Sequence, residues 1–544
     1  MSLDHQIMQQ QLSTGAARVD SYLTALTTAS KTPGIQYLVA MSTGVLFEHY
    51  SGWADIRRRM PVNTATTLMA YSMSKTITAA AVLQLVEIRR VGLDDPVEQY
   101  VDALPYGPNV TVRQLISHTS GIPNPLPLRW VHPAERHGNF DEDAALATVL
   151  HDHPRLSFAP GSKYAYSNIG YWLLGKVIER ASGETFSSYV TEHILRPLAI
   201  EPRELGYAVT DPACQATGYL EKYSLMNLAK GVLIDRDLVG DYAGRWLAIR
   251  SHYLNGPAFG GLVGSVRGFG KFLQDQLRDR SVLLGDETRQ MFYTQQQTTR
   301  GGAVPMTLGW HTGVLDGLPF FYKEGGGGGF HCMMRLYSGK GIGTVVMTNA
   351  TAFDVRDLLD TADASFLRET EPLMQRVEPM AHFTEPDPAE RSAFNRLFYR
   401  NRRPTWLGHW VSQFFCWWAR VGLPPRSWFA LEVRDRVSGR PRADAVVVPT
   451  VEGERYVVSM FGTISDWVHN IEAAQGDAVI AHGGSVRVRL VSVPPEERAP
   501  ILREYVRIAS SGRKHFPLPV GAPLADFAAI AARYPVYRIE APNA

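Results

Sequence analysis

The sequence predicts an α+β fold. Short runs rich in β-branched and aromatic residues lie at 34–52 and 306–350, where glycine-bearing turns separate them, as in antiparallel strands. Stretches rich in alanine and leucine, with capping signals, lie at 72–90 and 168–181, as in helices. Because helices dominate between the two groups of strands, without regular alternation of strand and helix, a doubly wound parallel sheet is not expected.

Local sequence signals predict each strand and helix. Residues 34–52 (GIQYLVAMSTGVLFEHYSG) predict two strands joined by a Ser-Thr-Gly turn. Residues 72–90 (SMSKTITAAAVLQLVEIRR) begin with a capping hydroxyl and end before Gly92, so they predict a helix. A second helix is predicted at 168–181, because this stretch follows the turn-rich APGSKYAYS and stops at Gly183. The runs MTLGWHT, FHCMMRLYS and GIGTVVMTN predict further strands.

At 544 residues the chain is too long for one ordinary domain, since domains average roughly 150 residues. A polar, proline-bearing stretch between about 366 and 395 is typical of a domain boundary, which we place near Asp387. We therefore expect a first domain at 1–375, a linker at 376–394 and a small β-rich domain at 395–544. The strands of the last domain include ADAVVVPTV, RYVVSMFG, AVIAHG and VRVRLVSV.

Composition and charge narrow the function classes. With 45% apolar residues, 20% charged residues and a net charge of +2, the chain lacks the basic excess of nucleic-acid binders, so no nucleic acid partner is expected. Cys214, Cys332 and Cys416 are too widely spaced for a disulfide framework or a cysteine-rich metal site. The N-terminus lacks the pattern of a secretory signal, and no run of about 18 apolar residues occurs, so we expect a cytoplasmic protein without a membrane span.

The sharpest local pattern is Ser72-Met73-Ser74-Lys75 at the start of a predicted helix. Three residues apart on a helix, a hydroxyl and an amine lie on one face, and the helix N-terminus adds positive potential. A lysine with a lowered pKa can act as a base toward the serine and make it a nucleophile for acyl transfer. A capping serine followed by a surface lysine has the same spacing, and a second match occurs at 511–514, so the pattern alone leaves both interpretations open.

Two further segments carry groups suited to the same chemistry. Tyr166 offers a phenol that can relay a proton, and Asn168 offers an amide that can bind a substrate carbonyl. Lys323-Glu324-Gly325 opens a glycine run through residue 329, where the backbone can approach a developing oxyanion closely. Taken singly, a packed tyrosine, a solvated lysine and a flexible loop explain these residues at least as well.

The order S-x-x-K, Y-x-N and K-x-G resembles that of the class C β-lactamase and penicillin-binding-protein-like serine hydrolases, which include esterases and D-aminopeptidases. The stretches TVRQLISHTSGIP, FAPGSKYAYSNIGYWLLGKVIE and LGWHTG are similar too, so the resemblance covers roughly residues 15–370. It implies a β-lactamase/transpeptidase-like fold, which is an antiparallel sheet flanked by helices plus an all-helical region, with the active site between them.

The same resemblance implies a role for each matching residue. Ser72 is expected to be the acylated nucleophile, Lys75 its general base and Tyr166 the proton relay toward the leaving group. We therefore expect a serine hydrolase, a carboxylesterase or amidase that cleaves a small-molecule ester or amide, with weak β-lactam hydrolysis as a side activity and no cofactor or metal. The expected substrate contacts are Asn168, Lys323 and Gly325, and the expected oxyanion hole consists of the backbone N–H groups of Ser72 and Gly326.

Basic side chains surround a Ser-Gly turn at 435–442 (DRVSGRPR), which suits a phosphorylated ligand or an ordinary basic hairpin. From about 395 to 540, through PPEERAPILREYVRIA and ARYPVYRIE, the chain resembles the deazaflavin-dependent nitroreductase and quinone-reductase family. This resemblance implies a small split β-barrel and a deazaflavin coenzyme. Where many members read G-[RK]-K-[ST]-G, this chain has Asp435 and Val437, which removes one cation and adds an anion. The candidate coenzyme contacts are Ser438, Arg442, Ser459 and Trp467.

Three functions stay open at this level. The first is the serine hydrolase, the second is a deazaflavin-dependent oxidoreductase in which the C-terminal barrel is the working part, and the third is a non-catalytic ligand-binding fusion. The sequence does not indicate an oligomeric state. A tryptophan-rich stretch could touch a membrane surface weakly, although packing against a neighbouring domain is the better expectation because prolines interrupt it. Its tryptophans are Trp406, Trp410, Trp417 and Trp418.

Overall fold

The structure is a computed structural model in which the chain forms two compact units, residues 1–385 and 386–544. The predicted boundary near Asp387 and the predicted linker at 376–394 lie outside the residues that the structure describes. The described residues are 3–125, 130–367 and 399–542, apart from positions 223, 229, 316, 352, 401–402, 405, 423–426, 437–438, 463–464, 510–511, 513–515, 517 and 519–520.

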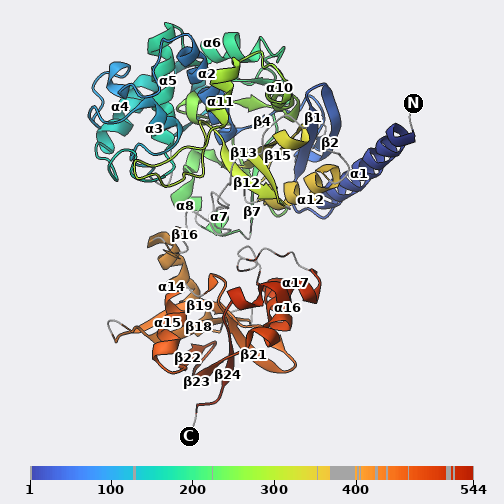
Figure 1. The fold of residues 1–544 in the computed structure, drawn as a ribbon, viewed down its shortest axis with the longest axis vertical. Helices are drawn as coiled ribbons and strands as arrows, with labels where there is room; N and C mark the ends of the chain where they lie inside the picture. The colour runs from blue at the N-terminus through green and yellow to red at the C-terminus, as the bar shows by residue number, and fades with distance from the viewer. Residues whose placement is uncertain are drawn as a thin grey trace. The chain divides into compact units, whose positions relative to one another are not determined.

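The first unit is built on a seven-stranded antiparallel sheet with the order β12-β13-β14-β15-β1-β2-β3 (Figure 1). The two strands predicted at 34–52 are β1 and β2, which pair as a hairpin. Because β1 also pairs with β15, this hairpin joins the strands from the far end of the unit. The strands are β1 (Gly34–Met41), β2 (Gly44–Asp55), β3 (Met60–Pro61), β12 (His311–Leu315), β13 (Leu318–Gly327), β14 (Phe330–Tyr337) and β15 (Ile342–Thr348).

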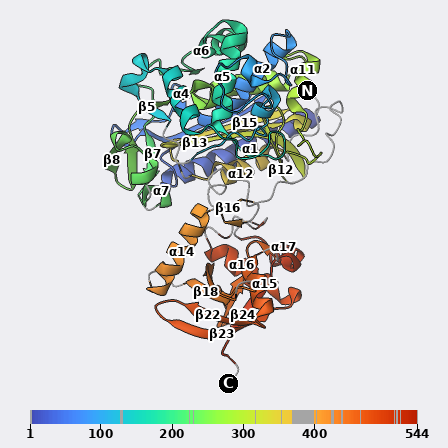
Figure 2. The same cartoon turned by 90° about the vertical axis from the view of Figure 1, so that its left-hand side faces the viewer.

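Helices cover both faces of this sheet: α1 (Leu3–Thr28), α12 (Val355–Leu367) and α10 (Val266–Leu277). α1 and α12 lie side by side (Figures 1 and 2), and Leu359 of α12 shares an apolar core with Tyr37 of β1. α10 contacts β1 and β15, and its Phe272 shares another core with Leu38. Successive residues of β1 therefore face two different cores, which explains why most of them are apolar and nearly all are buried.

The other helices of the first unit form a helical region with α2 and α5 in contact at its centre. α2 is buried on nearly all sides, as its alanine-rich and leucine-rich sequence allows. Three small sheets complete the unit, with the orders β4-β11-β6, β7-β9-β8 and β10-β5. These helices are α2 (Ser74–Glu87), α3 (Val112–Ile116), α4 (Glu142–Asp152), α5 (Asn168–Ser182), α6 (Phe186–Val190), α7 (Leu225–Leu228), α8 (Lys230–Leu233), α9 (Pro257–Gly260) and α11 (Asp286–Tyr293). The strands are β4 (Leu68–Met69), β5 (Val131–Pro133), β6 (Leu205–Gly206), β7 (Gly218–Glu221), β8 (Val239–Ala243), β9 (Trp246–Ile249), β10 (His252–Leu254) and β11 (Val263–Gly264).

The predicted helix boundaries hold with small changes. The prediction at 168–181 is confirmed as α5, whose N-cap Ser167 accepts a hydrogen bond from the N–H of Gly170 and whose C-cap Gly183 adopts a left-handed φ of 81°. The helix predicted at 72–90 consists of a 3₁₀ turn, η1 (Tyr71–Met73), followed by α2. It ends earlier than predicted because Arg89 adopts a left-handed φ of 58°, which a continuing helix does not allow.

The predicted strands between 306 and 350 need two corrections. MTLGWHT is a strand only from His311 onward, because the N–H of Thr307 donates to the carbonyl of Trp310 in a turn. The glycine run that could have been a flexible loop is instead ordered as far as Gly327, since β13 pairs with β14 through that residue.

The second unit contains a seven-stranded antiparallel sheet with the order β19-β18-β22-β23-β24-β21-β20. The four runs predicted as strands coincide with β19, β21, β22 and β23. The described part of the unit contains three apolar cores, one around Leu502 of α16, one around Leu431 of β18 and a small one around Cys416 of α14. The elements are α14 (Trp406–Arg420), α15 (Asp466–Ala473), α16 (Arg498–Ile508), α17 (Leu524–Ile530), β18 (Trp428–Arg434), β19 (Pro441–Val447), β20 (Thr450–Val451), β21 (Glu454–Val458), β22 (Asp477–Ala481), β23 (Ser485–Ser492) and β24 (Val536–Glu540), beside a short hairpin of β16 (Tyr399–Arg400) and β17 (Arg403–Pro404).

Candidate active site

Ser72 lies in the 3₁₀ turn that leads into α2, and its side chain is half-buried. Two groups contact its hydroxyl oxygen: Lys75 Nζ at 3.0 Å and the phenol of Tyr166, which donates a hydrogen bond of 2.8 Å. Ser72 and Lys75 lie close together because they are three residues apart in one helical turn. Tyr166 comes from the loop before α5. The structure therefore brings together the three residues for which the sequence predicted catalytic roles.

The backbone just before Ser72 is strained. Tyr71 adopts a left-handed φ of 45°, which is rare for a bulky residue and is held only where the surroundings over-determine it. The Tyr71 hydroxyl contacts Nε2 of His252 at 2.8 Å and donates to the carbonyl of Gly328 at 3.3 Å. The hydroxyl of Ser74 donates to the carbonyl of Tyr71 at 2.7 Å. These bonds hold the turn that presents Ser72.

The amine of Lys75 is fully buried and lies close to three oxygen atoms. It lies 2.7 Å from Oδ1 of Asn168 and 2.5 Å from the carbonyl oxygen of Phe259, besides its contact with Ser72. Burial and the neighbouring charge of Lys323 hold the pKa of Lys75 well below its usual range. A neutral amine has two N–H donors and one lone pair. The carbonyl oxygens of Asn168 and Phe259 can only accept, so they take the two donors and the lone pair is left for Ser72.

Tyr166 is held among charged and aromatic groups. Its ring lies 4.2 Å from the ring of His118, centroid to centroid. Lys75 Nζ lies 5.1 Å and Lys323 Nζ 5.6 Å from the centre of the Tyr166 ring. These neighbours fix the position of the phenol, whose hydroxyl donates to Ser72.

Asn168 and Lys323 both lie in the wall of the site. Asn168 is the first residue of α5, and its amide nitrogen donates to Oδ1 of Asn124 at 3.1 Å, which turns its oxygen toward Lys75. Lys323, on β13, is completely buried, and its Nζ also lies 5.6 Å from the ring of Tyr171. Lys323 is therefore part of the interior of the site and is not the solvated lysine that its sequence also allowed.

Glycine is required at 325 because β13 passes directly against the turn that carries Ser72. A Cβ atom at Gly325 would lie 2.1 Å from the carbonyl oxygen of Ala70 and 2.9 Å from the backbone nitrogen of Ser72, closer than real Cβ atoms come. At Gly326 a Cβ atom would instead face the ring of His331, on the opposite side of the strand. The glycines thus allow the backbone of β13 to lie beside the N–H of Ser72.

Sequence reasoning missed several groups that complete this site. Asn124, the carbonyl of Phe259 and the ring of Tyr171 contact the predicted residues, and His252 contacts Tyr71, the residue before Ser72. A backbone carbonyl has no signal in a sequence. Asn124 lies 44 residues from Asn168 in the chain and His252 lies 181 residues from Tyr71, so only packing brings these side chains to the site.

In the second unit, the described candidates for coenzyme contact gather at the first turn of α15. Arg442 lies 3.5 Å from the carboxylate of Asp466, the first residue of that helix. The buried hydroxyl of Ser459 contacts the hydroxyl of Ser465 at 2.8 Å, and Trp467 packs its ring near Tyr537. Ser438 lies outside the described residues.

Among the residues that the structure describes, no three histidine, cysteine, aspartate or glutamate side chains come together as metal ligands would. No described helix combines the length and the apolar character that crossing a membrane requires.

Known relatives match part of the chain. Penicillin-binding protein 4* of Bacillus subtilis (strain 168) is 25% identical over 305 residues, which are 55% of this chain and 64% of that protein. Protein flp of Staphylococcus aureus (strain MW2) is 27% identical over 174 residues, which are 31% of this chain and 34% of that protein. The chain thus spans from a third to somewhat under two thirds of these relatives.

Solved structures share the fold. The octameric penicillin-binding protein homologue from Pyrococcus abyssi has a TM-score of 0.55 at 19% identity, over 87% of this chain and 95% of that chain. D-amino acid amidase from Ochrobactrum anthropi SV3, in complex with D-phenylalanine, has a TM-score of 0.52 at 18% identity, over 66% of this chain and 99% of that chain. The profile of the Beta-lactamase family matches residues 19–367, more than half of the chain. The chain therefore belongs to the Beta-lactamase family.

Proposed function

We propose that the enzyme cleaves a small ester or amide through an acyl-enzyme on Ser72. The observation that carries this proposal is the row of contacts from Lys75 Nζ through Ser72 Oγ to the phenol of Tyr166, at 3.0 Å and 2.8 Å. Nucleophile and base within hydrogen-bond reach, with the base oriented by further groups, is the arrangement that activates a serine. Here Asn168 and the carbonyl of Phe259 orient the base.

The proposed reaction starts with a proton transfer. The neutral amine of Lys75 takes the proton of the Ser72 hydroxyl as the oxygen attacks the acyl carbon. The phenol of Tyr166, on the other side of the same oxygen, delivers a proton to the departing alkoxide or amine. The N–H groups of Ser72 and Gly326 bind the oxyanion, and the close passage of β13 beside Ser72 supports this assignment. Water then hydrolyses the acyl-enzyme by the same route in reverse.

The substrate is proposed from the charge of the site. Lys323 adds a positive charge in the interior of the site, which suits a substrate that carries a carboxylate near the scissile bond. Among the relatives, one is named a penicillin-binding protein and one a D-amino acid amidase, which supports small amides, with β-lactam hydrolysis as a side activity. A panel of small esters, D-amino-acid amides and a chromogenic cephalosporin would rank these classes.

The proposal is tested at Ser72 itself. The wild-type enzyme should release p-nitrophenol from p-nitrophenyl acetate and should carry an acetyl group on the peptide that contains Ser72 in mass spectrometry. Ser72→Ala should lose both, because no nucleophile remains. Ser188→Ala, at an exposed serine of α6, is the matched control and should keep both. Equal rates in Ser72→Ala and the wild type would reject the proposal.

For the second unit, the split β-barrel and the deazaflavin coenzyme stay predictions. A phosphorylated coenzyme needs cations or free N–H groups, and helix N-termini often supply them. At the first turn of α15 the carboxylate of Asp466 lies within 4 Å of Arg436 and Arg442, so an anion already faces both cations. The hydroxyl of Ser459 is bonded to Ser465 and to the carbonyl of Gly462. These described residues do not fit a phosphate, so we derive no redox step, and the hydrolase is preferred over an oxidoreductase or a non-catalytic fusion.

A further inference from the structure

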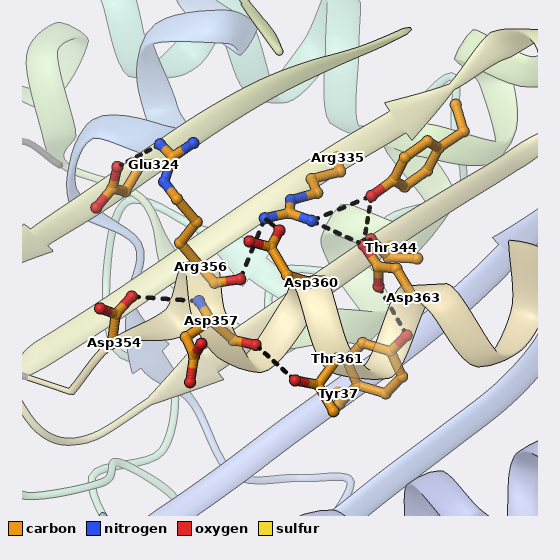
Figure 3. A network of polar contacts seen from close by, with 11 residues as sticks. Tyr37, Glu324, Arg335, Thr344, Asp354, Arg356, Asp357, Asp360, Thr361 and Asp363 are labelled. Carbon is orange, nitrogen blue, oxygen red and sulfur yellow. Dashed lines mark hydrogen bonds and ion pairs between the residues drawn. The ribbon is translucent and has the colours of Figure 1, made fainter. Parts of the chain in front are cut away.

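The middle residue of the Lys323-Glu324-Gly325 motif faces away from Ser72. Side chains alternate along a strand, and Lys323 and Gly325 lie toward the catalytic groups. Glu324 therefore lies on the opposite face of β13, where its side chain is only 8% exposed. There Glu324 contacts His331 of β14 at 2.8 Å. It also contacts Arg356 of α12 at 3.4 Å (Figure 3).

The contact between Glu324 and His331 requires a proton. Nδ1 of His331 lies 2.6 Å from the carbonyl oxygen of Phe353, and because a carbonyl can only accept, Nδ1 must carry a hydrogen. In a neutral ring with that hydrogen, Nε2 would turn a lone pair toward the carboxylate of Glu324. A bond of 2.8 Å between Nε2 and Oε1 thus needs a second proton, shared between the ring and the carboxylate.

The surroundings favour this extra proton. Burial lowers the pKa of His331, but the hydrogen bond and charge of Glu324, the carbonyl of Phe353 and the charge of Asp354 together raise the pKa above its usual value. Besides Glu324 and Asp354, the guanidinium of Arg356 is a charged group beside this pair, and it contacts Glu324. A histidine whose pKa is raised by folding contributes its stabilising interaction at low pH and loses it as the pH rises through the raised value.

Arg356 ties this pair to the rest of the sheet. Its backbone carbonyl accepts a hydrogen bond of 3.2 Å from Arg335 of β14, and Arg335 also lies 2.6 Å from Asp360 of α12 (Figure 3). The guanidinium of Arg356 lies over the ring of Tyr322 on β13. Glu324 is thus held from one side by β14 and from the other by α12, directly behind the peptide units of Gly325 and Gly326.

We propose that Glu324, His331 and Arg356 are positioning residues for the oxyanion hole, which hold the glycine segment of β13 against Ser72 only while Glu324 and His331 share a proton. This inference rests on the proposed function. When the proton is lost, the carboxylate of Glu324 faces the lone pair of Nε2 on His331. β13 then relaxes away from this contact. A displacement of about 1 Å near reacting groups can cost on the order of 10²-fold in rate.

Two substitutions of Glu324 separate positioning from general stability. In Glu324→Gln the amide oxygen can still accept from Arg356, while the amide nitrogen can donate to a neutral Nε2 of His331, so the contact needs no extra proton. Glu324→Ala removes the contact altogether. His193→Gln is the matched control, because His193 pairs with Glu184 at 2.9 Å on the exposed surface, near Gln84, about 15 Å along α2 from its start.

The full-length enzyme is assayed from pH 5 to 10 by the rate at which a fluorophosphonate probe labels Ser72 and by kcat and KM for p-nitrophenyl acetate. The wild type and His193→Gln should lose rate as the pH rises through the pKa of His331, by roughly tenfold or more. Glu324→Gln should stay within about threefold of the wild type at the optimum and lose most of this alkaline fall. Glu324→Ala should lower kcat by about 10–10²-fold with little change in KM.

The titration of His331 is followed separately by the NMR signal of its ring. It should lie above the usual histidine range in the wild type and move down in Glu324→Gln. An alkaline fall that is identical in the wild type and Glu324→Gln overturns the inference, and so does a normal kcat in Glu324→Ala. Failure of the probe to label Ser72 in the wild type would instead reject the proposed function, while the NMR titration still reports on the shared proton.

Discussion

At the scale of single residues, the site is defined by two buried lysines near one phenol. Both Lys75 and Lys323 are completely buried, and each lies within 6 Å of the centre of the Tyr166 ring. Two like charges in a poorly solvated space disfavour each other, so one of them gives up its proton more easily. The pKa of Lys75 is the one that burial and Lys323 lower, and Lys75 is the one beside Ser72.

Replacing Lys323 by methionine should raise the pKa of Lys75, because the neighbouring positive charge is removed while the burial stays. The base form of Lys75 exists above its pKa, so the acid limb of the rate of Ser72 labelling should move to higher pH, on the order of one pH unit. The pH dependence of labelling by a fluorophosphonate probe measures this. Lys222→Met, at an exposed lysine, is the control. An unmoved acid limb in Lys323→Met would show that Lys323 does not act on Lys75.

A methyl group at position 325 should separate β13 from the turn of Ser72. Gly325→Ala places a Cβ atom 2.1 Å from the carbonyl oxygen of Ala70, so one of the two backbones must move. The expected loss in kcat for p-nitrophenyl acetate is about 10²-fold, the size typical of a lost oxyanion donor. Gly339→Ala, where the new Cβ atom meets nothing within 4 Å, should keep the wild-type kcat. Activity in Gly325→Ala equal to that of Gly339→Ala would contradict the role of this strand.

At the scale of elements, a buried ion pair fastens α12 to the sheet. Asp363 of α12 and Arg335 of β14 are both fully buried, 3.4 Å apart. The hydroxyls of Tyr37 and Thr344, from β1 and β15, donate to the same carboxylate at 3.0 Å each (Figure 3). Removing Asp363 would leave these two buried hydroxyls without this acceptor, although Arg335 keeps its contact with Asp360, so α12 depends on this residue.

The stability of α12 should fall as the pH rises from about 4 to 6. Burial raises the pKa of Asp363 from 3.8 to about 6 in spite of its donors, so the folded state holds this proton more tightly than the unfolded state does. The favourable contribution is complete below the unfolded pKa and is lost as the pH rises through about 6, a change of up to ~3 kcal/mol. The free energy of opening of α12, from amide hydrogen exchange, measures it.

Asp363→Asn should flatten this pH dependence, because the amide does not titrate. Asp357→Asn, at an exposed position of the same helix, should retain the dependence of the wild type. A slope that persists in Asp363→Asn would assign the titration to another group.

At the scale of the whole molecule, each of the two compact units has its own apolar cores. The proposed catalytic residues all come from the first unit, and the core of the second is built around residues such as Leu502, which is fully buried. The second unit therefore has a folded core of its own, as the first unit does.

Leu502→Ala should destabilise the second unit by about 2–5 kcal/mol, because the truncated side chain leaves a cavity in the core. Hydrogen exchange of the amides of α16 and β21 measures the loss. Val486→Ala, at a side chain that is 61% exposed, should change the stability by less than about 0.5 kcal/mol. Similar protection in the two variants would mean that Leu502 does not belong to the core of this unit.

Some features could be predicted because they depend on neighbours in the chain. Capping residues and turns located α5 closely, and the spacing of Ser72 and Lys75 places their side chains on one turn whatever the rest of the fold does. The end of the helix at Arg89 could not be predicted, because its surroundings, and not a glycine, impose the left-handed backbone conformation there.

The sequence by itself determined which chemical groups the protein carries, their order in the chain and the class of fold. Only the tertiary structure decided which of them meet: it brought Tyr166 to Ser72, buried Lys323 beside the same phenol and placed Glu324 against His331 on the far face of the strand. Contacts between distant segments depend on strand register and on packing, and the protonation of Lys75 depends on burial. None of these is a property of local sequence, because each is set by the whole set of neighbours in space.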